Sequence, residues 1–161
     1  MHSTRDSKNA SVAPGTPTAP TLNRVLVVED NVVQLRLMMF LLKRLGVEVA
    51  LAQNGQQGFE AILGGEPAPL ILMDLHMPRF DGIGATEQIR QWEKKNNVPR
   101  RTIVAVTANT YEEDRLRCLN AGMDDVAFKP VSQQSLVKLL TQWLPGYTPP
   151  ALPDAPASST L

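Results

Sequence analysis

Five side chains with ligating or reactive groups stand at the ends of short apolar runs, namely Glu29, Asp30, Asp74, Thr107 and Lys129. Three clustered carboxylates repel one another unless a cation lies among them, and hard oxygen ligands with room for water suit Mg²⁺. A carboxylate beside such an ion can attack phosphorus and form an aspartyl phosphate. A hydroxyl and an ammonium group can stabilise the charge on the transferring phosphoryl group. These residue types predict phosphoryl transfer to Asp74 if the fold brings them together.

The elements that must position these side chains are predicted from alternating strand and helix signals. Runs rich in β-branched and aliphatic residues predict strands, and longer segments with capping residues or a terminal glycine predict helices. The unalternated run 70–73 is typical of a strand that is buried on both faces. The predicted strands cover 24–28, 47–51, 70–73, 102–106 and 125–128, and the predicted helices cover 31–45, 54–63, 83–94, 110–120 and 132–144.

Five repeats of a strand followed by a helix predict an α/β fold with a parallel sheet covered by helices on both faces. Right-handed crossovers favour a flavodoxin-like, doubly wound sheet of five strands in the order 2-1-3-4-5, with five helices. Parallel strands direct their carboxyl ends to one edge of the sheet, where ligands collect. We therefore expect the five side chains to meet at that edge, with strands 1 and 3 flanking the topological switch point.

Each of these residues has a plain structural explanation when it is taken alone. Aspartate is favoured at helix caps, so Asp74 could simply begin a helix. Glu29 and Asp30 could form a solvated turn, and Lys129 could be a surface charge. Helix capping explains one acid, but it does not explain three acids with a threonine and a lysine at one edge. The predicted convergence therefore favours the functional interpretation.

The composition excludes several classes of protein. The chain has 161 residues, and its sixteen basic and sixteen acidic residues cancel, which argues against nucleic acid as a partner. No apolar run approaches the roughly 20 residues that span a bilayer, so no membrane insertion is expected. The first residues lack the apolar core of a secretory signal. The single cysteine, Cys118, excludes an intrachain disulfide and indicates a cytoplasmic protein.

Proline-rich segments flank the predicted domain. Residues 1–23 consist largely of Ser, Thr, Ala and Pro, and residues 145–161 contain five prolines. Such segments cannot bury enough apolar surface to offset the entropy of ordering the chain. We therefore expect disordered tails at 1–23 and 145–161 and one domain at 24–144.

Four motifs follow one another in an order known from a protein family. They are Val27-Val28-Glu29-Asp30-Asn31, Met73-Asp74-Leu75-His76-Met77-Pro78 with Asp81-Gly82, Val106-Thr107-Ala108-Asn109, and Ala121-Gly122-Met123-Asp124-Asp125 with Lys129-Pro130. Together they resemble the receiver domain of two-component response regulators, in particular the receivers fused to hybrid histidine kinases. The resemblance extends over residues 24–144, and the combination is far more specific than any single motif.

The resemblance implies a role in a phosphorelay. A phosphohistidine on a sensor histidine kinase or a histidine phosphotransfer protein is expected to phosphorylate Asp74. Glu29 and Asp30 would hold Mg²⁺ together with Asp74 and the backbone carbonyl of His76. No turnover of an external substrate is expected, only Mg²⁺-dependent self-phosphorylation from a donor and slow self-dephosphorylation.

The same resemblance implies that Thr107 and Lys129 bind the phosphoryl group and that the peptide bond before Pro130 is cis. The chain departs from the family pattern three residues before the lysine, where Val126 replaces a common aromatic residue and Phe128 follows where a small residue is usual. Valine has one short, stiff χ1 angle and cannot swing a ring between interior and surface. A receiver that acts as a phosphorylation-independent docking module therefore remains the alternative.

The first predicted helix is too apolar to be explained by one buried face. At about 100° per residue, one stripe is predicted to cover the sheet, namely Leu37, Met38, Leu41 and Leu45. A second stripe is predicted to dock a helical partner beside Asp74. Its residues are Val32, Leu35, Arg36, Met39 and Phe40. Burial of the whole helix by the tails is the other interpretation, which the polar composition of the tails disfavours.

Two enzyme-like or ligand-binding alternatives are less well supported. A phosphohydrolase with an aspartyl nucleophile carries a second acid two residues after the nucleophile, where this chain has His76. A nucleotide-binding site would need a glycine-rich loop after the first strand, where Glu29-Asp30-Asn31 stands instead.

Overall fold

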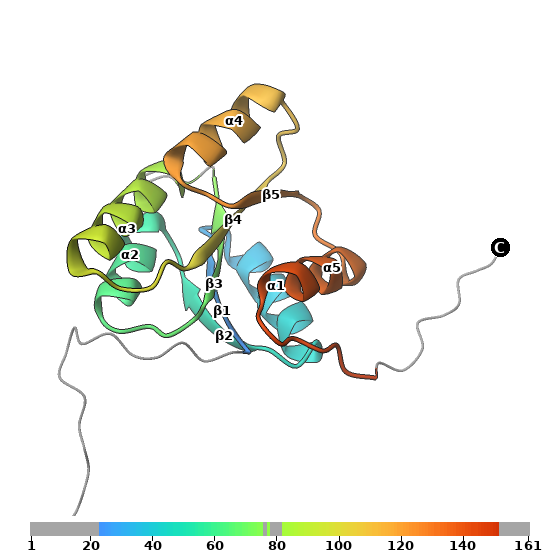
Figure 1. Cartoon of the computed structure of the whole chain (residues 1–161). Coiled ribbons are helices and arrows are strands. Elements are labelled where there is room, and N and C mark those ends of the chain that lie inside the picture. Colours follow the sequence, from blue (N-terminus) through green and yellow to red (C-terminus); the bar gives the residue numbers. More distant parts are fainter. Residues whose placement is uncertain (1–22, 76, 78–81, 152–161) are drawn as a thin grey trace, which may run out of the picture.

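Strands and helices alternate throughout the computed structural model, which describes residues 23–75, 77 and 82–151. The strands are β1 (Arg24–Val28), β2 (Glu48–Ala52), β3 (Leu70–Asp74), β4 (Thr102–Thr107) and β5 (Asp125–Phe128). The helices are α1 (Val32–Arg44), α2 (Gly55–Leu63), α3 (Gly82–Asn96), α4 (Glu112–Ala121) and α5 (Gln133–Trp143). The strands form one parallel sheet in the order β2-β1-β3-β4-β5, so the predicted flavodoxin-like topology is confirmed (Figure 1).

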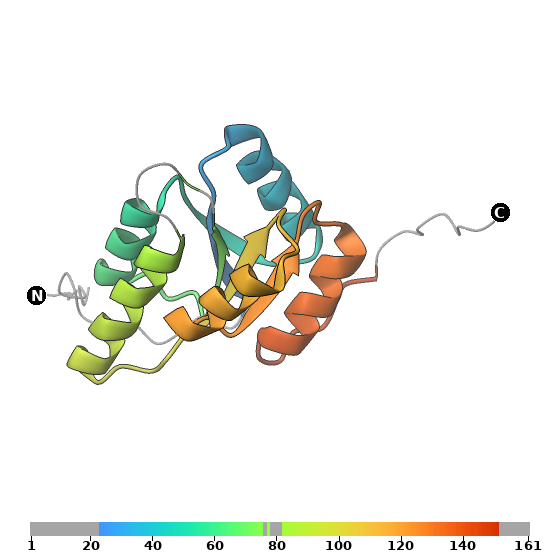
Figure 2. The same ribbon diagram turned by 90° about the horizontal axis from the view of Figure 1, so that it is seen from above.

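Helices cover both faces of this sheet (Figures 1 and 2). Helices α1 and α5 pack on one face and α2, α3 and α4 on the other, which produces two apolar clusters of buried side chains. Successive strand residues point to opposite faces, so Val25 and Val27 join the α1/α5 cluster while Leu26 and Val28 join the other. Burial on both faces explains why the central strands are apolar at nearly every position.

The core stripe predicted for α1 is confirmed for Met38 and Leu41, which pack against the α1/α5 cluster, but not for Leu37. The α1 side chains that face the sheet and α5 include Leu35 and Leu42, which are buried, and Leu45 just after the helix is buried as well. Leu35 is only 4% exposed, so its assignment to the docking patch was wrong, whereas Leu37, which was assigned to the core, is 52% exposed. Residues of both apolar stripes pack in the α1/α5 cluster, Leu35 from one and Met38 and Leu41 from the other.

The carboxyl end of β3 depends on a close backbone approach at Gly82, the first residue of α3. A Cβ atom at this position would collide with the carbonyl oxygen of Asp74 and would lie 2.9 Å from Met73 Cγ. The absence of a side chain therefore lets the start of α3 pack directly against the end of β3.

The packed part of the chain continues beyond Leu144, where the sequence predicts that the domain ends. Tyr147 is 8% exposed in the α1/α5 cluster, and its hydroxyl donates a 2.7 Å hydrogen bond to the carbonyl of Leu45. The expected boundary therefore lay too early, because a buried aromatic anchor follows two residues after Pro145.

None of the helices in the described ranges is long and apolar enough to cross a membrane.

Candidate functional site

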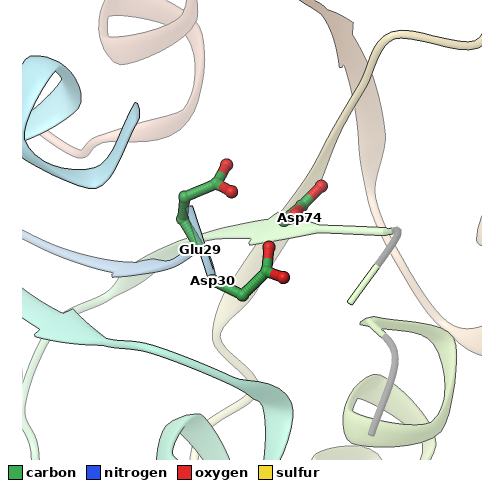
Figure 3. A group of neighbouring side chains, drawn as sticks. All are labelled: Glu29, Asp30 and Asp74. Carbon is green, nitrogen blue, oxygen red and sulfur yellow. The ribbon is translucent and has the colours of Figure 1, made fainter. Parts of the chain in front are cut away.

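Three carboxylates meet at the carboxyl edge of the sheet (Figure 3). Glu29 and Asp30 follow β1, Asp74 ends β3, and the pairing of Val28 with Met73 brings these strand ends together. One carboxylate oxygen from each residue lies within 4.8 Å of the others. Glu29 and Asp74 are buried and Asp30 is half-buried, so the three carboxylates have little contact with solvent. The predicted convergence of the acids is therefore present in the fold.

Lys129 supplies a cation to this cluster from the end of β5. Its Nζ lies 3.0 Å from Glu29 Oε1 and 3.3 Å from Asp74 Oδ1. Burial alone would lower the pKa of Lys129, but the hydrogen bond that it donates to Glu29 and the charge of Asp74 outweigh burial and raise this pKa. Lys129 is therefore held as an ammonium ion. The peptide bond between Lys129 and Pro130 is cis, as predicted.

Glu29 is fixed by two donors. Its Oε2 accepts the backbone N–H of Asn31 at 3.0 Å, while its Oε1 faces Lys129. Desolvation raises the pKa of Glu29 above its usual value, and the two hydrogen bonds only partly oppose this effect. The charged carboxylate is therefore costly here, and a further cation at the cluster would reduce that cost.

Thr107 lies at the same edge, at the end of β4, and is 1% exposed. Its Oγ1 accepts the backbone N–H of Asn109 at 3.0 Å, so the hydroxyl proton remains available to another acceptor. Its backbone carbonyl accepts the N–H of Lys129 at 2.8 Å, which ties the two strand ends together. The hydroxyl and the ammonium are thus positioned by adjacent strands.

The remaining predicted residues have mixed outcomes. His76, whose carbonyl was expected at the metal, lies outside the described residues. In the predicted docking patch Val32, Arg36 and Phe40 are exposed and Met39 is half-buried, whereas Leu35 belongs to the core.

A groove lies on the opposite flank of α1 from Val32 and Met39. It has a volume of about 360 Å³ and is mainly apolar. Two of its lining residues, Glu29 and Lys129, belong to the acidic site, so the groove opens directly beside Asp74. The other lining residues are Gln34, Leu37, Met38, Leu41, Ala108, Pro130 and Val131. This groove was not predicted, because its walls come from α1 and from the distant loops that follow β4 and β5.

The loop between β4 and α4 contains a residue that sequence reasoning did not single out. The spacing of Thr110 and Glu113 suggests a capping box, yet the residue that caps α4 is Tyr111, and it makes no side-chain capping bond. Asn109 instead accepts the N–H of Tyr111 and donates to Asp114. An Asn three residues before a helix is the signal that could have indicated this turn.

The donor set fits a hard divalent cation. Three carboxylates face one ammonium group among the described residues of the cluster, so negative charge is in excess. Carboxylate oxygens with space for water are the ligands that Mg²⁺ prefers. A carboxylate held beside such a cation, a lysine and a threonine hydroxyl has the groups that phosphoryl transfer requires.

Known proteins with a related sequence are sensor kinases. Sensor protein GacS of Pseudomonas syringae pv. syringae is 38% identical over 129 residues, which cover 80% of this chain and 14% of GacS. Hybrid signal transduction histidine kinase L of Dictyostelium discoideum is 35% identical over 124 residues, which cover 76% of this chain and 7% of the kinase. The chain therefore spans only a small part of the length of these relatives.

Solved structures of receiver domains also match this chain. The receiver domain of sensor histidine kinase PA1611 from Pseudomonas aeruginosa PAO1, with a magnesium ion coordinated in its active site cleft, matches with a TM-score of 0.68 and 35% identity. The match covers 77% of this chain and 98% of that receiver. The co-crystal structure of Saccharomyces cerevisiae Ypd1 with the receiver domain of Ssk1 matches with a TM-score of 0.71 and 35% identity, covering 79% of this chain and 91% of that chain.

The family described as response regulator receiver domain matches residues 25–141, which are most of the chain. The matched range begins at the second residue of β1 and ends within α5, so it covers all or most of every strand and helix of the described fold. The chain belongs to the response regulator receiver domain family.

Proposed function

We propose that this chain accepts a phosphoryl group on Asp74 from a phosphohistidine of a partner protein, with Mg²⁺ held by Glu29, Asp30 and Asp74. One observation carries the proposal: three carboxylates lie within 4.8 Å of one another, and the Lys129 ammonium lies 3.3 Å from the proposed nucleophile. The function is signalling through a phosphorylated aspartate and the protein contacts that it changes.

The chemical step follows from the positions of these side chains. A carboxylate oxygen of Asp74 attacks phosphorus, the bond from phosphorus to the histidine nitrogen breaks, and its electron pair returns to the imidazole. Bound Mg²⁺ would reduce the repulsion between the carboxylates and the phosphoryl oxygens. Lys129 neutralises charge beside Asp74, and the Thr107 hydroxyl can donate to a phosphoryl oxygen. Burial of Asp74 keeps water away from the new acyl phosphate.

The structures of two relatives support both the binding of Mg²⁺ and the kind of partner protein that we propose. The PA1611 receiver holds a magnesium ion in its active site cleft, and the Ssk1 receiver was crystallised with the histidine phosphotransfer protein Ypd1. We infer a partner of the same kind for this chain, either a histidine phosphotransfer protein or the corresponding part of a sensor kinase, in the cytoplasm.

The groove beside α1 is the docking site that we favour for this partner. It exposes the apolar side chain of Leu37 next to Met38 and Leu41, and it ends at Glu29 and Lys129. A partner helix in this groove would therefore place its histidine beside the acidic site. The exposed Phe40 and Arg36 on the outward side of α1 lie on the same helix and could extend the interface.

Intact-mass spectrometry after incubation with Mg²⁺ and acetyl phosphate tests the acceptor role. We expect one phosphoryl group on the wild type, and none on Asp74→Ala or without Mg²⁺. Glu87→Ala, which changes an exposed acid of α3, is the matched control and should be phosphorylated like the wild type.

Two other outcomes would contradict the proposal in different ways. A gain that persists in Asp74→Ala would mean that another residue is the acceptor. No gain under any condition would favour the phosphorylation-independent docking module, to which the replacement of the usual aromatic residue by Val126 lends its only support.

A further inference from the structure

Strand β2 ends the strand order of the sheet, and it pairs with β1 on one side (Figure 1). The N–H of Glu48 points to that side, where it donates to the carbonyl of Asn23 at 2.8 Å. Because the backbone groups of successive strand residues point to opposite sides, Val49 and Leu51 direct their N–H and C=O groups away from β1. The outer edge of β2 therefore presents backbone donors and acceptors for a further strand.

Bonds within the chain close both ends of this open edge. The N–H of Val47 donates to a carbonyl of α1 at 3.1 Å, and the N–H of Gln53 donates to Gln57 Oε1 at 2.8 Å. Between these points β2 contains neither proline nor lysine, which commonly prevent an edge strand from pairing with another chain. The other edge strand, β5, contains Asp125, which accepts a backbone N–H and the indole N–H of Trp143.

The flank of α1 beside the β2 edge is apolar and basic. Leu51 pairs with Val27 of the α1/α5 cluster, so its side chain lies on the α1 face of the sheet, where it is 43% exposed. At about 100° per residue, Arg36 and Lys43 project from α1 on the side away from the groove, toward β2. Both are exposed, neither forms an ion pair with a described residue, and α1 contains no acid. The positive charge on this flank is therefore unbalanced.

We propose that the outer edge of β2 binds an extended, acidic segment of another protein, which joins the sheet as an additional strand. Backbone hydrogen bonds to Val49 and Leu51 hold the segment at the edge. Its acidic side chains on the α1 face lie beside Arg36 and Lys43, and this charge complementarity selects it over a neutral or basic segment. The surface is thus an interaction site in addition to the acidic cluster at Asp74.

An acidic partner fits this edge better than a second copy of the chain. Glu48, the acid of β2, lies on the opposite face from Val49 and is paired with Arg24 at 3.3 Å, so it does not neutralise the α1 flank. Two β2 strands related by a two-fold axis would place two basic α1 flanks on the same face of a joined sheet, where they repel. The edge lies across α1 from the groove, so this inference does not rest on the proposed function.

Amide hydrogen exchange, followed residue by residue by NMR on the full chain, tests the proposal. The probe is a short capped peptide in which threonine or valine alternates with glutamate, and the matched probe has lysine in place of glutamate. In the free protein we expect fast exchange at Val49 and Leu51 and slow exchange at Ala50, whose N–H points to β1. Near saturation the glutamate peptide should slow exchange at Val49 and Leu51 about tenfold, and the lysine peptide should not.

Two changes separate the contributions of backbone and charge. N-methylation of the glutamate peptide removes its donors without altering the protein, and it should weaken binding about tenfold or more. Lys43→Glu should weaken binding about fivefold at low salt, and less at high salt. Lys138→Glu, which changes an exposed lysine of α5, is the matched control and should bind like the wild type. Lys43 is changed rather than Arg36 because Arg36 belongs to the surface proposed for the histidine partner.

The outcomes distinguish the occupants of the edge. Protection at Val49 and Leu51 by the glutamate peptide, lost on N-methylation and reduced in Lys43→Glu, supports the proposal. Slow exchange at these amides in the free chain would overturn it, with a dependence on protein concentration indicating a second copy. No protection by the glutamate peptide, or equal protection by the lysine peptide, would also overturn it. Phosphoryl gain from acetyl phosphate should be the same in wild type, Lys43→Glu and Lys138→Glu, so failure of the acceptor role is read separately.

Discussion

The two edges of the same sheet differ in how their charged side chains are paired. At the carboxyl edge, three clustered acids, Glu29, Asp30 and Asp74, stand beside Lys129, which pairs with Glu29 and Asp74, so acids are in excess among the described residues. At the amino edge, four arginines and four acids lie in one network of ion pairs and hydrogen bonds. These arginines are Arg24, Arg90, Arg100 and Arg101, and the acids are Glu48, Glu66, Glu93 and Asp124.

The amino-edge bonds join elements that are distant in sequence. Arg24, at the start of β1, forms two bonds with Glu66, and Arg90 of α3 reaches both Glu93 and Asp124. Arg101 is 8% exposed, and its guanidinium donates to backbone carbonyls of the loop before β3. Desolvation lowers the pKa of Arg101, and the charges of Glu93 and Glu66 only partly oppose it.

The difference indicates which cluster serves stability and which serves function. Matched, hydrogen-bonded charges are expensive to break but perform no chemistry by themselves. An excess of like charge costs stability and persists where a ligand or a reaction uses it. Substitutions at the amino edge should therefore reduce stability and leave phosphorylation intact, and substitutions at the carboxyl edge should do the reverse.

The largest effect is expected for Glu93→Ala at the amino edge. Glu93 is 4% exposed, accepts Arg90 on one oxygen and accepts the backbone N–H of Arg101 on the other. Its removal leaves a buried guanidinium and a buried N–H without this partner, so urea unfolding should show a loss of about 3 to 5 kcal/mol. Phosphorylation of the folded protein should be unchanged.

Glu87→Ala is the matched control for this prediction, because it removes an exposed acid from the same helix. Its effect on the free energy of unfolding should stay within about 0.5 kcal/mol. Equal losses in the two variants would show that the amino-edge network does not hold the sheet together.

The next effect is expected for Asp30→Asn at the carboxyl edge. Removing one of three clustered acids relieves repulsion, so the Mg²⁺-free protein should become more stable than the wild type. The wild type should gain about 2.7 kcal/mol at a Mg²⁺ concentration one hundred times its dissociation constant, and the variant should lose most of this gain. Thermal unfolding with and without Mg²⁺ measures both.

The Glu87→Gln variant serves as the control here, because it removes one exposed acid that is not part of the cluster. It should keep the full Mg²⁺ response. A Mg²⁺ response in Asp30→Asn that equals the wild type would argue against Asp30 as a ligand.

A smaller loss is expected for Tyr147→Phe, which belongs to the amino-edge side of the molecule. The change keeps the buried ring and removes the hydroxyl that donates to the Leu45 carbonyl, so stability should fall by about 1 kcal/mol. Tyr111→Phe, at a position 71% exposed, should change stability by less than half as much. Equal effects would mean that the segment after α5 does not anchor α1.

The site was predictable from sequence to a greater extent than the surfaces around it. The alternation of strands and helices specifies a parallel sheet, and a parallel sheet brings Asp74, Thr107 and Lys129 to one edge whatever the details of packing. These residues are therefore located by topology alone, while their roles remain predictions.

The errors arose where packing partners decide the outcome. Two apolar stripes of α1 satisfy the same helical periodicity, and packing in the α1/α5 cluster buries Leu35 while Leu37 stays exposed. Tyr147 follows a proline and a glycine, so local composition suggests a tail, whereas its ring is buried in the α1/α5 cluster and its hydroxyl bonds to the Leu45 carbonyl. The Asn109 hydrogen bonds depend on the conformation of a short loop, which periodicity does not describe.

The smallest effect is expected for Thr86→Val, which replaces a buried, unpaired hydroxyl and should increase stability. Thr86 is fully buried in the first half of α3, and its Oγ1 has no hydrogen-bond partner among the described residues. Valine has nearly the same shape and a similar helix propensity, so the change removes an unpaired hydroxyl and should stabilise the protein by about 0.5 kcal/mol. Thr141→Val, at an exposed position of α5, should have almost no effect. If Thr86→Val stabilises the protein without changing phosphorylation, the unpaired hydroxyl is only a cost in stability. If phosphorylation falls as stability rises, the Thr86 hydroxyl contributes to the function of the carboxyl edge.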